Sequence, residues 1–106
     1  MPAWWAWCSA LPGYKAGPLR LRFRFWGRVQ GVGFRWRAAG AARQLGLSGW
    51  VQNQPDGSVL LEAQGREEDI DRMILAIEAS PYIRIENMEV KKLEPLERTY
   101  GFEVKD

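Results

Sequence analysis

The sequence contains no histidine and a single cysteine, Cys8. Without a second cysteine no intrachain disulfide can form, and without histidine neither a Cys/His zinc site nor a histidine general base is available. No apolar run approaches the roughly 20 residues of a membrane-spanning helix, and residues 1–15 lack the basic start of a signal peptide. We therefore expect a cytoplasmic protein with no membrane partner, no metal and no other cofactor.

Acidic residues are absent from the first half of the chain. Residues 1–55 contain eight Lys or Arg and no Asp or Glu, whereas residues 56–106 contain thirteen acids and seven bases. The first half could therefore present a positive potential suited to an anionic small molecule or to nucleic acid. Alternatively, the two halves interleave in the fold and their charges offset each other, and the sequence leaves both possibilities open.

The sequence is long enough for one domain. With 106 residues, 46% of them hydrophobic, it can close one core but not two. Residues 1–18 show no regular period and contain several prolines and glycines, so we interpret them as an extension outside the core, and residues 19–106 as the domain. Trp4, Trp5 and Trp7 in this extension could contact a partner, but nothing in the sequence says which.

Apolar periodicity predicts a strand and a helix at the start of the domain. Alternation over residues 19–25 predicts a strand with Phe23 and Phe25 on its buried face and arginines on the other face. Helical spacing follows over residues 34–45, and Gly46 is suited to end that helix.

The second half continues with a hairpin, a helix and two strands. Residues 48–53 and 58–64 are strand-like and are joined by a QPDG turn. The second helix begins at the acidic residues 67–69. The remaining expectations are an apolar helix face (Ile70, Met73, Ile74, Ile77), a helix end at Ser80 and Pro81, a strand from Ile83 to Val90 with a bulge near Glu86 and Asn87, and a closing strand with Tyr100, Phe102 and Val104.

The order of these elements predicts the α+β class. It matches the ferredoxin-like split βαβ sandwich (βαββαβ), an antiparallel sheet with two helices on one face. This fold occurs in enzymes, metal carriers, regulatory modules and RNA-binding proteins, so the fold does not determine the function.

The stretch GRVQGVGFR, residues 27–35, lies between the first strand and the first helix. Gly31 and Gly33 can adopt positive φ, so that the N–H groups from Gln30 to Arg35 turn toward one point, to which the helix N-terminus adds its dipole. This is a candidate phosphate site. The spacing matches no known nucleotide-binding loop, and by itself it is more typical of a tight turn.

Arg35 strengthens the anion interpretation. A cation in the first turn of a helix opposes the helix dipole, whereas an anion bound between the loop and the guanidinium would reverse the sign of that effect. The guanidinium also offers paired donors that fit two phosphate oxygens. The alternative is an arginine that extends into water.

Two motifs together carry a resemblance to a known family. GRVQGVGFR, followed by GWVQN (Gly49–Asn53) and a closing TYGFEV, resembles the acylphosphatases over residues 19–106. The resemblance implies hydrolysis of acyl phosphates to a carboxylate and inorganic phosphate, without a metal or a covalent phosphoenzyme. It also implies that Arg35 is the catalytic arginine and that Asn53 orients the attacking water. The implied phosphate-binding residues are Gln30, Gly31, Val32, Gly33, Phe34 and Arg35.

The chemistry of the residues agrees with this resemblance. Phosphoryl transfer through a loose transition state needs positioning and charge stabilisation, which amides and one arginine can supply. A carboxylate leaving group departs without a proton donor, so the absence of histidine is no handicap. Asn53 could hold a water but not deprotonate it. Its alternative role is that of a strand-end residue opening the turn at Gln54 and Pro55.

We therefore expect an enzyme that acts as a monomer on a small acyl phosphate, with inorganic phosphate or sulfate as competing anions and no nucleic-acid partner. One alternative is a binding module for an anion or RNA without catalysis, in which Phe23 and Phe25 would stack bases; the alternation that exposes the arginines argues against it. A second alternative is an acylphosphatase-like domain of a larger hydrogenase maturation factor, and the end of the sequence at Asp106 favours a free-standing enzyme instead.

Overall fold

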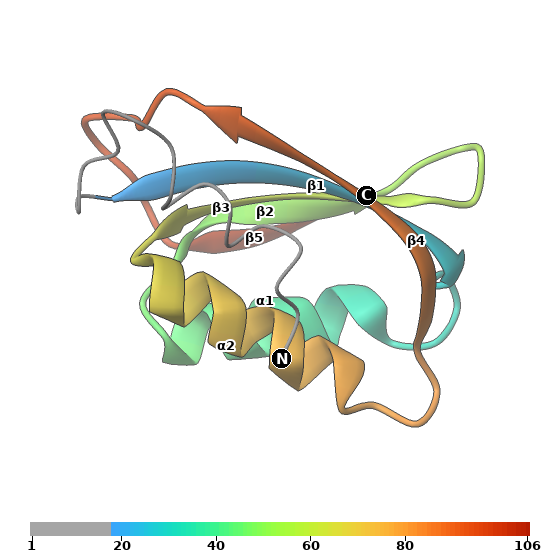
Figure 1. Cartoon of the computed structure of the whole chain (residues 1–106). Helices are drawn as coiled ribbons and strands as arrows, with labels where there is room; N and C mark the ends of the chain where they lie inside the picture. Colours follow the sequence, from blue (N-terminus) through green and yellow to red (C-terminus); the bar gives the residue numbers. More distant parts are fainter. Residues whose placement is uncertain (1–17) are drawn as a thin grey trace.

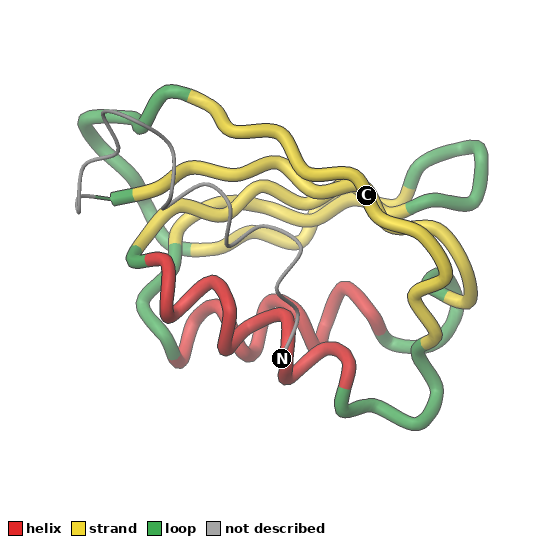
Figure 2. The backbone as a smooth tube through the Cα atoms, viewed as in Figure 1, coloured by secondary structure: helices red, strands yellow, loops and turns green. Residues whose placement is uncertain are grey.

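The computed structural model describes residues 18–106, which form a five-stranded sheet with two helices on one face (Figure 1, Figure 2). The elements are β1 (Leu19–Arg28), α1 (Phe34–Gln44), β2 (Ser48–Asn53), β3 (Val59–Gly65), α2 (Glu67–Glu78), β4 (Arg84–Leu93) and β5 (Phe102–Lys105). This order confirms the predicted fold class. The predicted extension falls almost wholly on residues 1–17, which lie outside the described part.

The strand order in the sheet is β4-β1-β3-β2-β5. Strands β1, β2, β3 and β4 pair in antiparallel fashion, but β5 runs parallel to β2. The sequence predicted an antiparallel sheet and did not anticipate this one parallel pair. It arises because the chain leaves β4 at one edge, reverses direction and returns along the opposite edge beside β2.

The core lies between the sheet and the helices. Phe23 and Phe25 of β1 are fully buried with stacked rings 5.6 Å apart, and Phe34 of α1 packs on Phe25 at 5.1 Å. The predicted apolar face of α2 is likewise buried, as are Val51, Val59 and Leu61 of the central hairpin. The alternation in β1 therefore predicted its buried face correctly, and rings buried in this way cannot stack RNA bases.

Local sequence signals place the helix end and the strand irregularity. Gly46 has φ +71°, and the following N–H of Leu47 donates to Ala42 O at 2.9 Å, which closes α1 in a Schellman motif. In β4 the register against β1 skips Glu86, so the predicted bulge is confirmed. Opposite the bulge, Gly27 has φ +126°, and a Cβ there would lie 2.3 Å from Arg84 O.

The last strand is shorter than predicted. It begins at Phe102, and Tyr100, which was expected to belong to it, lies outside it with 84% of its surface exposed. The strand ends at Lys105, one residue after Val104, the last residue of the alternation that predicted the strand. Phe102 and Val104 do face the core and pack against it.

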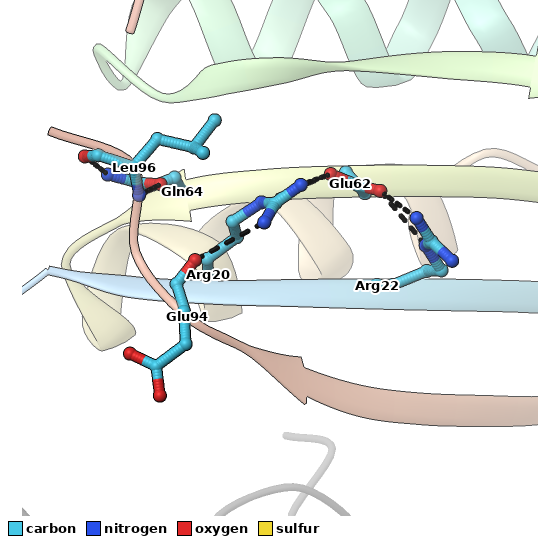
Figure 3. A network of polar contacts seen from close by, with 6 residues as sticks. All are labelled: Arg20, Arg22, Glu62, Gln64, Glu94 and Leu96. Atoms are coloured by element: carbon cyan, nitrogen blue, oxygen red, sulfur yellow. Dashed lines mark hydrogen bonds and ion pairs between the residues drawn. The ribbon is translucent and has the colours of Figure 1, made fainter. Parts of the chain in front are cut away.

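The helix-free face of the sheet is not the open basic face that alternation in β1 suggested. Arg20 and Arg22 both donate hydrogen bonds to the carboxylate of Glu62 on β3, and Glu62 is only 4% exposed (Figure 3). Because β3 comes from the acidic half and lies between β1 and β2 from the basic half, the two charge sets interleave. On this face the second of the two charge interpretations is correct.

Candidate active site

The loop between β1 and α1 has the backbone geometry of an anion site. Gly31 has φ +72° and Gly33, the N-cap of α1, has φ +79°, and neither would meet a neighbouring atom with an added Cβ. Left-handed residues alternating with right-handed ones turn successive N–H groups to the same side. These glycines are therefore required for backbone conformation rather than for space.

The fold of residues 18–106 leaves the N–H groups of this loop unused. Within residues 18–106, no backbone N–H from Gln30 to Trp36 donates a hydrogen bond, and the first bond of α1 runs from Arg37 N to Gly33 O at 3.0 Å. No acidic residue stands in the first turn of α1 to complement its dipole. The helix N-terminus thus offers donors and a positive potential, and no neighbouring acidic residue of the first turn neutralises that potential.

Arg35 is fixed by the end of β5. Its Nη1 donates to the carbonyl of Lys105 at 3.0 Å and lies 3.7 Å from the carboxylate of Asp106, while the side chain remains 28% exposed. Within residues 18–106 the Nε and Nη2 donors of Arg35 have no hydrogen-bond partner. Within residues 18–106 the guanidinium is therefore anchored through one nitrogen and keeps a pair of donors unengaged, so it is not the solvent-extended arginine of the alternative.

Asn53 is the last residue of β2. Its Oδ1 is buried and has no hydrogen-bond partner among residues 18–106. A buried acceptor without a partner is unusual and needs an explanation, such as a bound water or a functional role. Asn53 does not close the following turn with its side chain: Gln54 N donates to Ser58 O, and the Asp56 carboxylate accepts from Ser58.

Gln30 joins the loop to this turn. Its side-chain Nε2 donates to Gln54 O and to Ser58 O, both at 2.8 Å. The sequence placed Gln30 at the anion site through its backbone N–H, and the contact of its side chain with the turn was missed. No sequence signal could have revealed it, because the partners are 24 and 28 residues away and meet only in the folded sheet.

These contacts bring the predicted site residues to one end of the sheet, at the β1–α1 loop and the β2–β3 turn, which lie on the right in Figure 1. Gln30 ties the loop to the residue after Asn53, and Arg35 is tied to the end of β5. Strands β2 and β5 are neighbours, with Gln52 opposite Lys105, so Asn53 lies one residue beyond that pair. Phe34 is placed differently from the others: its ring is in the core, and only its N–H remains for the site.

The charges near the turn are held in place by hydrogen bonds. The side-chain and backbone donors of Ser58 lower the pKa of Asp56, with Arg24 adding a weaker effect at 3.7 Å. Asp56 is thereby kept ionised and directed toward Ser58 within its own turn. In residues 18–106 no three His, Cys, Asp or Glu side chains are grouped so that they could hold a metal ion, and neither helix has the length and apolar character needed to cross a membrane.

Comparison with known proteins identifies the family. The Acylphosphatase family model matches residues 21–104, which include the whole loop, Arg35 and Asn53. The chain belongs to the acylphosphatase family. An acylphosphatase of Oceanobacillus iheyensis is 44% identical over 81 residues, covering 74% of this chain and 89% of the relative. This protein is thus an enzyme that hydrolyses acyl phosphates, and the interpretation as a binding module without catalysis is set aside.

Solved acylphosphatase structures share the fold. The crystal structure of acylphosphatase from Bacillus subtilis matches with a TM-score of 0.76 at 34% identity, over 83% of this chain and 99% of that one. Full-length HypF in its phosphate- and nucleotide-bound form matches with a TM-score of 0.75 at 27% identity, over 90% of this chain but 13% of HypF. The same fold therefore occurs both as a small acylphosphatase and as one part of a longer protein.

Proposed function

We propose that this acylphosphatase hydrolyses its substrate by direct attack of an oriented water, without a metal ion and without a phosphoenzyme. In this mechanism the phosphoryl oxygens bind the N–H groups of residues 30–35 and the free donors of Arg35. The supporting observation is that these donors have no partner among residues 18–106 and lie at the positive end of α1. Charge that develops on the equatorial oxygens then meets donors already in place.

Asn53 supplies the position of the nucleophile in this proposal. Its buried Oδ1 lacks a hydrogen-bond partner among residues 18–106 and can accept a hydrogen bond from one water proton. The oxygen of that water attacks phosphorus while the bond from phosphorus to the acyl oxygen breaks. The leaving group departs as a carboxylate, and the proton of the attacking water ends on the phosphate product or in solvent.

No general acid is needed on the leaving-group side. A carboxylic acid has a pKa of about 4–5, so its conjugate base leaves as an anion at neutral pH. Water attacking a loose, metaphosphate-like centre also needs little help from a base, because bond formation lags behind bond breaking. Positioning by Asn53 and electrostatic stabilisation by Arg35 and the loop are then sufficient for the reaction.

The test is turnover of a simple aromatic acyl phosphate with and without a strong chelator. We expect the rate to survive chelation, because the proposed charge stabilisation comes from protein N–H groups. Inorganic phosphate and sulfate should inhibit competitively and raise the melting temperature, since they bind the native loop and not the unfolded chain. An obligatory magnesium ion, or inhibition by phosphate that is not competitive, would contradict this mechanism.

A further inference from the structure

Both N–H donors of the Gln30 side chain are engaged with the β2–β3 turn. Its Nε2 carries two hydrogens and has two acceptors, Gln54 O and Ser58 O, each at 2.8 Å. The same two carbonyls also close the turn itself, since Gln54 N donates to Ser58 O at 2.8 Å and Gly57 N donates to Gln54 O at 3.1 Å. One side chain from the loop therefore holds both ends of this turn.

This arrangement links the two halves of the proposed site. Gln30 begins the loop whose N–H groups bind the phosphoryl oxygens in the proposed function, and Gln54 directly follows Asn53. With both of its hydrogens engaged, the Gln30 amide does not serve as a phosphate donor. It fixes where the loop lies relative to the backbone that carries Asn53.

We propose that Gln30 is a positioning residue that sets the distance between the bound phosphorus and the water held by Asn53. This inference rests on the proposed function. The phosphoryl group is bound by the loop and Arg35, which remain when the Gln30 side chain is removed. The water is held by Asn53, on the other side of the contact between Gln30 and the turn. Loosening that contact therefore affects the approach of the nucleophile more than the affinity for the anion. A displacement of about 1 Å costs roughly 10²-fold in rate.

The chain contains a matched control for this contact. At the opposite end of β3, Gln64 also holds a loop by two hydrogen bonds: its Nε2 donates to Leu96 O, and its Oε1 accepts from Leu96 N, both at 2.9 Å (Figure 3). Gln30→Met and Gln64→Met each remove two bonds of similar length with little change in side-chain volume. They should lower the melting temperature by similar amounts while differing in their effect on catalysis.

The experiment measures kcat, KM and the dissociation constant of inorganic phosphate for both variants. We expect Gln30→Met to lower kcat by at least about tenfold, with phosphate affinity within about threefold of the parent, since the loop N–H groups are retained. Gln64→Met should leave kcat unchanged. Loss of phosphate binding together with kcat in Gln30→Met, or an equal loss of kcat in Gln64→Met, would overturn the positioning role.

A double-mutant cycle separates this inference from the proposed mechanism. In an Asn53→Ala background Gln30→Met should have little further effect on kcat, because there is no oriented water left to misplace. If Asn53→Ala alone keeps near-normal turnover, the water-orienting mechanism fails. If Asn53→Ala lowers kcat as proposed but Gln30→Met reduces the remaining rate as much as in the parent, the mechanism stands and the positioning role fails.

If Gln30→Met does not fold, a second variant, Gln30→Glu, tests the same role. Gln30→Glu has the same shape but places acceptor oxygens against two carbonyls, and regains one donor when the carboxyl is protonated. Its kcat relative to the parent should therefore rise as the pH falls toward 5. A ratio that stays constant with pH would contradict a role through these hydrogen bonds.

Discussion

Arg35 Nη1 donates a hydrogen bond of 3.0 Å to the main-chain carbonyl of Lys105. This bond joins the first turn of α1 to the end of β5 across 70 residues of sequence. It holds the guanidinium of Arg35 at the end of the sheet, beside the strand that ends at Asn53. Both the orientation of the arginine and its remaining donors follow from this contact.

Substitution of Arg35 tests its part in binding and in the transition state. Arg35→Ala should lower kcat/KM by about 10³-fold and abolish measurable phosphate binding. The reason is that an arginine in contact with the transferring phosphoryl group acts in both the ground state and the transition state. Arg35→Lys should recover little, since a lysine lacks paired donors. Steady-state kinetics with calorimetric titration of phosphate measure both effects. Full rescue by lysine would mean that only the charge is needed.

Asn53→Ala should separate binding from turnover. The side chain is proposed to contact only the water, so kcat should fall by about 10²-fold while the phosphate dissociation constant stays nearly unchanged. The variant should remain as stable as the parent, because Asn53 Oδ1 has no protein partner to lose among residues 18–106. If this substitution also abolished phosphate binding, Asn53 would instead be a residue that braces the loop.

Glu62 should contribute stability that depends on pH. Burial raises the pKa of Glu62, but hydrogen bonds from Arg22 and Arg20 outweigh this effect and hold the pKa below its ordinary value of 4.5. A carboxyl with a lowered folded-state pKa stabilises the native state above its ordinary pKa and loses that contribution as the pH falls through the folded value. Glu62→Gln should therefore cost about 2 kcal/mol at pH 7 and progressively less below pH about 4.

Urea unfolding at pH 7 and pH 3.5 measures this difference. Glu89→Gln is the matched control, because Glu89 lies on the same face of the sheet in β4, is exposed, and forms no ion pair within residues 18–106. Its substitution should change stability little at either pH. Equal effects of the two substitutions at pH 7 would show that the contacts of Glu62 with Arg20 and Arg22 add nothing beyond a surface charge.

Removal of residues 1–18 tests the proposed domain boundary. We expect the shortened protein to keep its activity and melting temperature, because the matched family region begins at residue 21 and the first strand begins at Leu19. The enthalpy of unfolding scales with the number of ordered residues. Calorimetry of both forms should give similar enthalpies, and a loss of more than about half would place the removed segment in the core.

The sequence predicted those features that depend on neighbouring residues. Alternation of Phe23 and Phe25 with arginines identified the buried face of β1, Gly46 marked the end of α1, and the broken alternation in β4 located the bulge at Glu86. Each of these signals lies within a few residues of the feature that it specifies. The glycines of the loop predicted a candidate anion site in the same way, whereas Asn53 was singled out only by the resemblance of GWVQN to the acylphosphatases.

The missed features depend on residues that are far apart in the sequence. The pairing of Glu62 with Arg20 and Arg22, the contact of Gln30 with the turn, and the parallel alignment of β5 with β2 all arise from strand order. A polar residue such as Gln30 has the same local signature whether it faces water, phosphate or a distant carbonyl. Only the register of the folded sheet distinguishes these cases.

We expect the short edge strand β5 to give this enzyme a route to inactivation that does not require global unfolding. It has four residues, pairs only with β2 within residues 18–106, and carries the carbonyl that anchors Arg35. Detachment of β5 would leave the pairing of β1 to β4 intact, and such sub-global openings cost less free energy than full unfolding. In native-state hydrogen exchange the amides of β5 should therefore exchange before those of β1 and β3, and with rising denaturant the catalytic rate should decline before the secondary structure does.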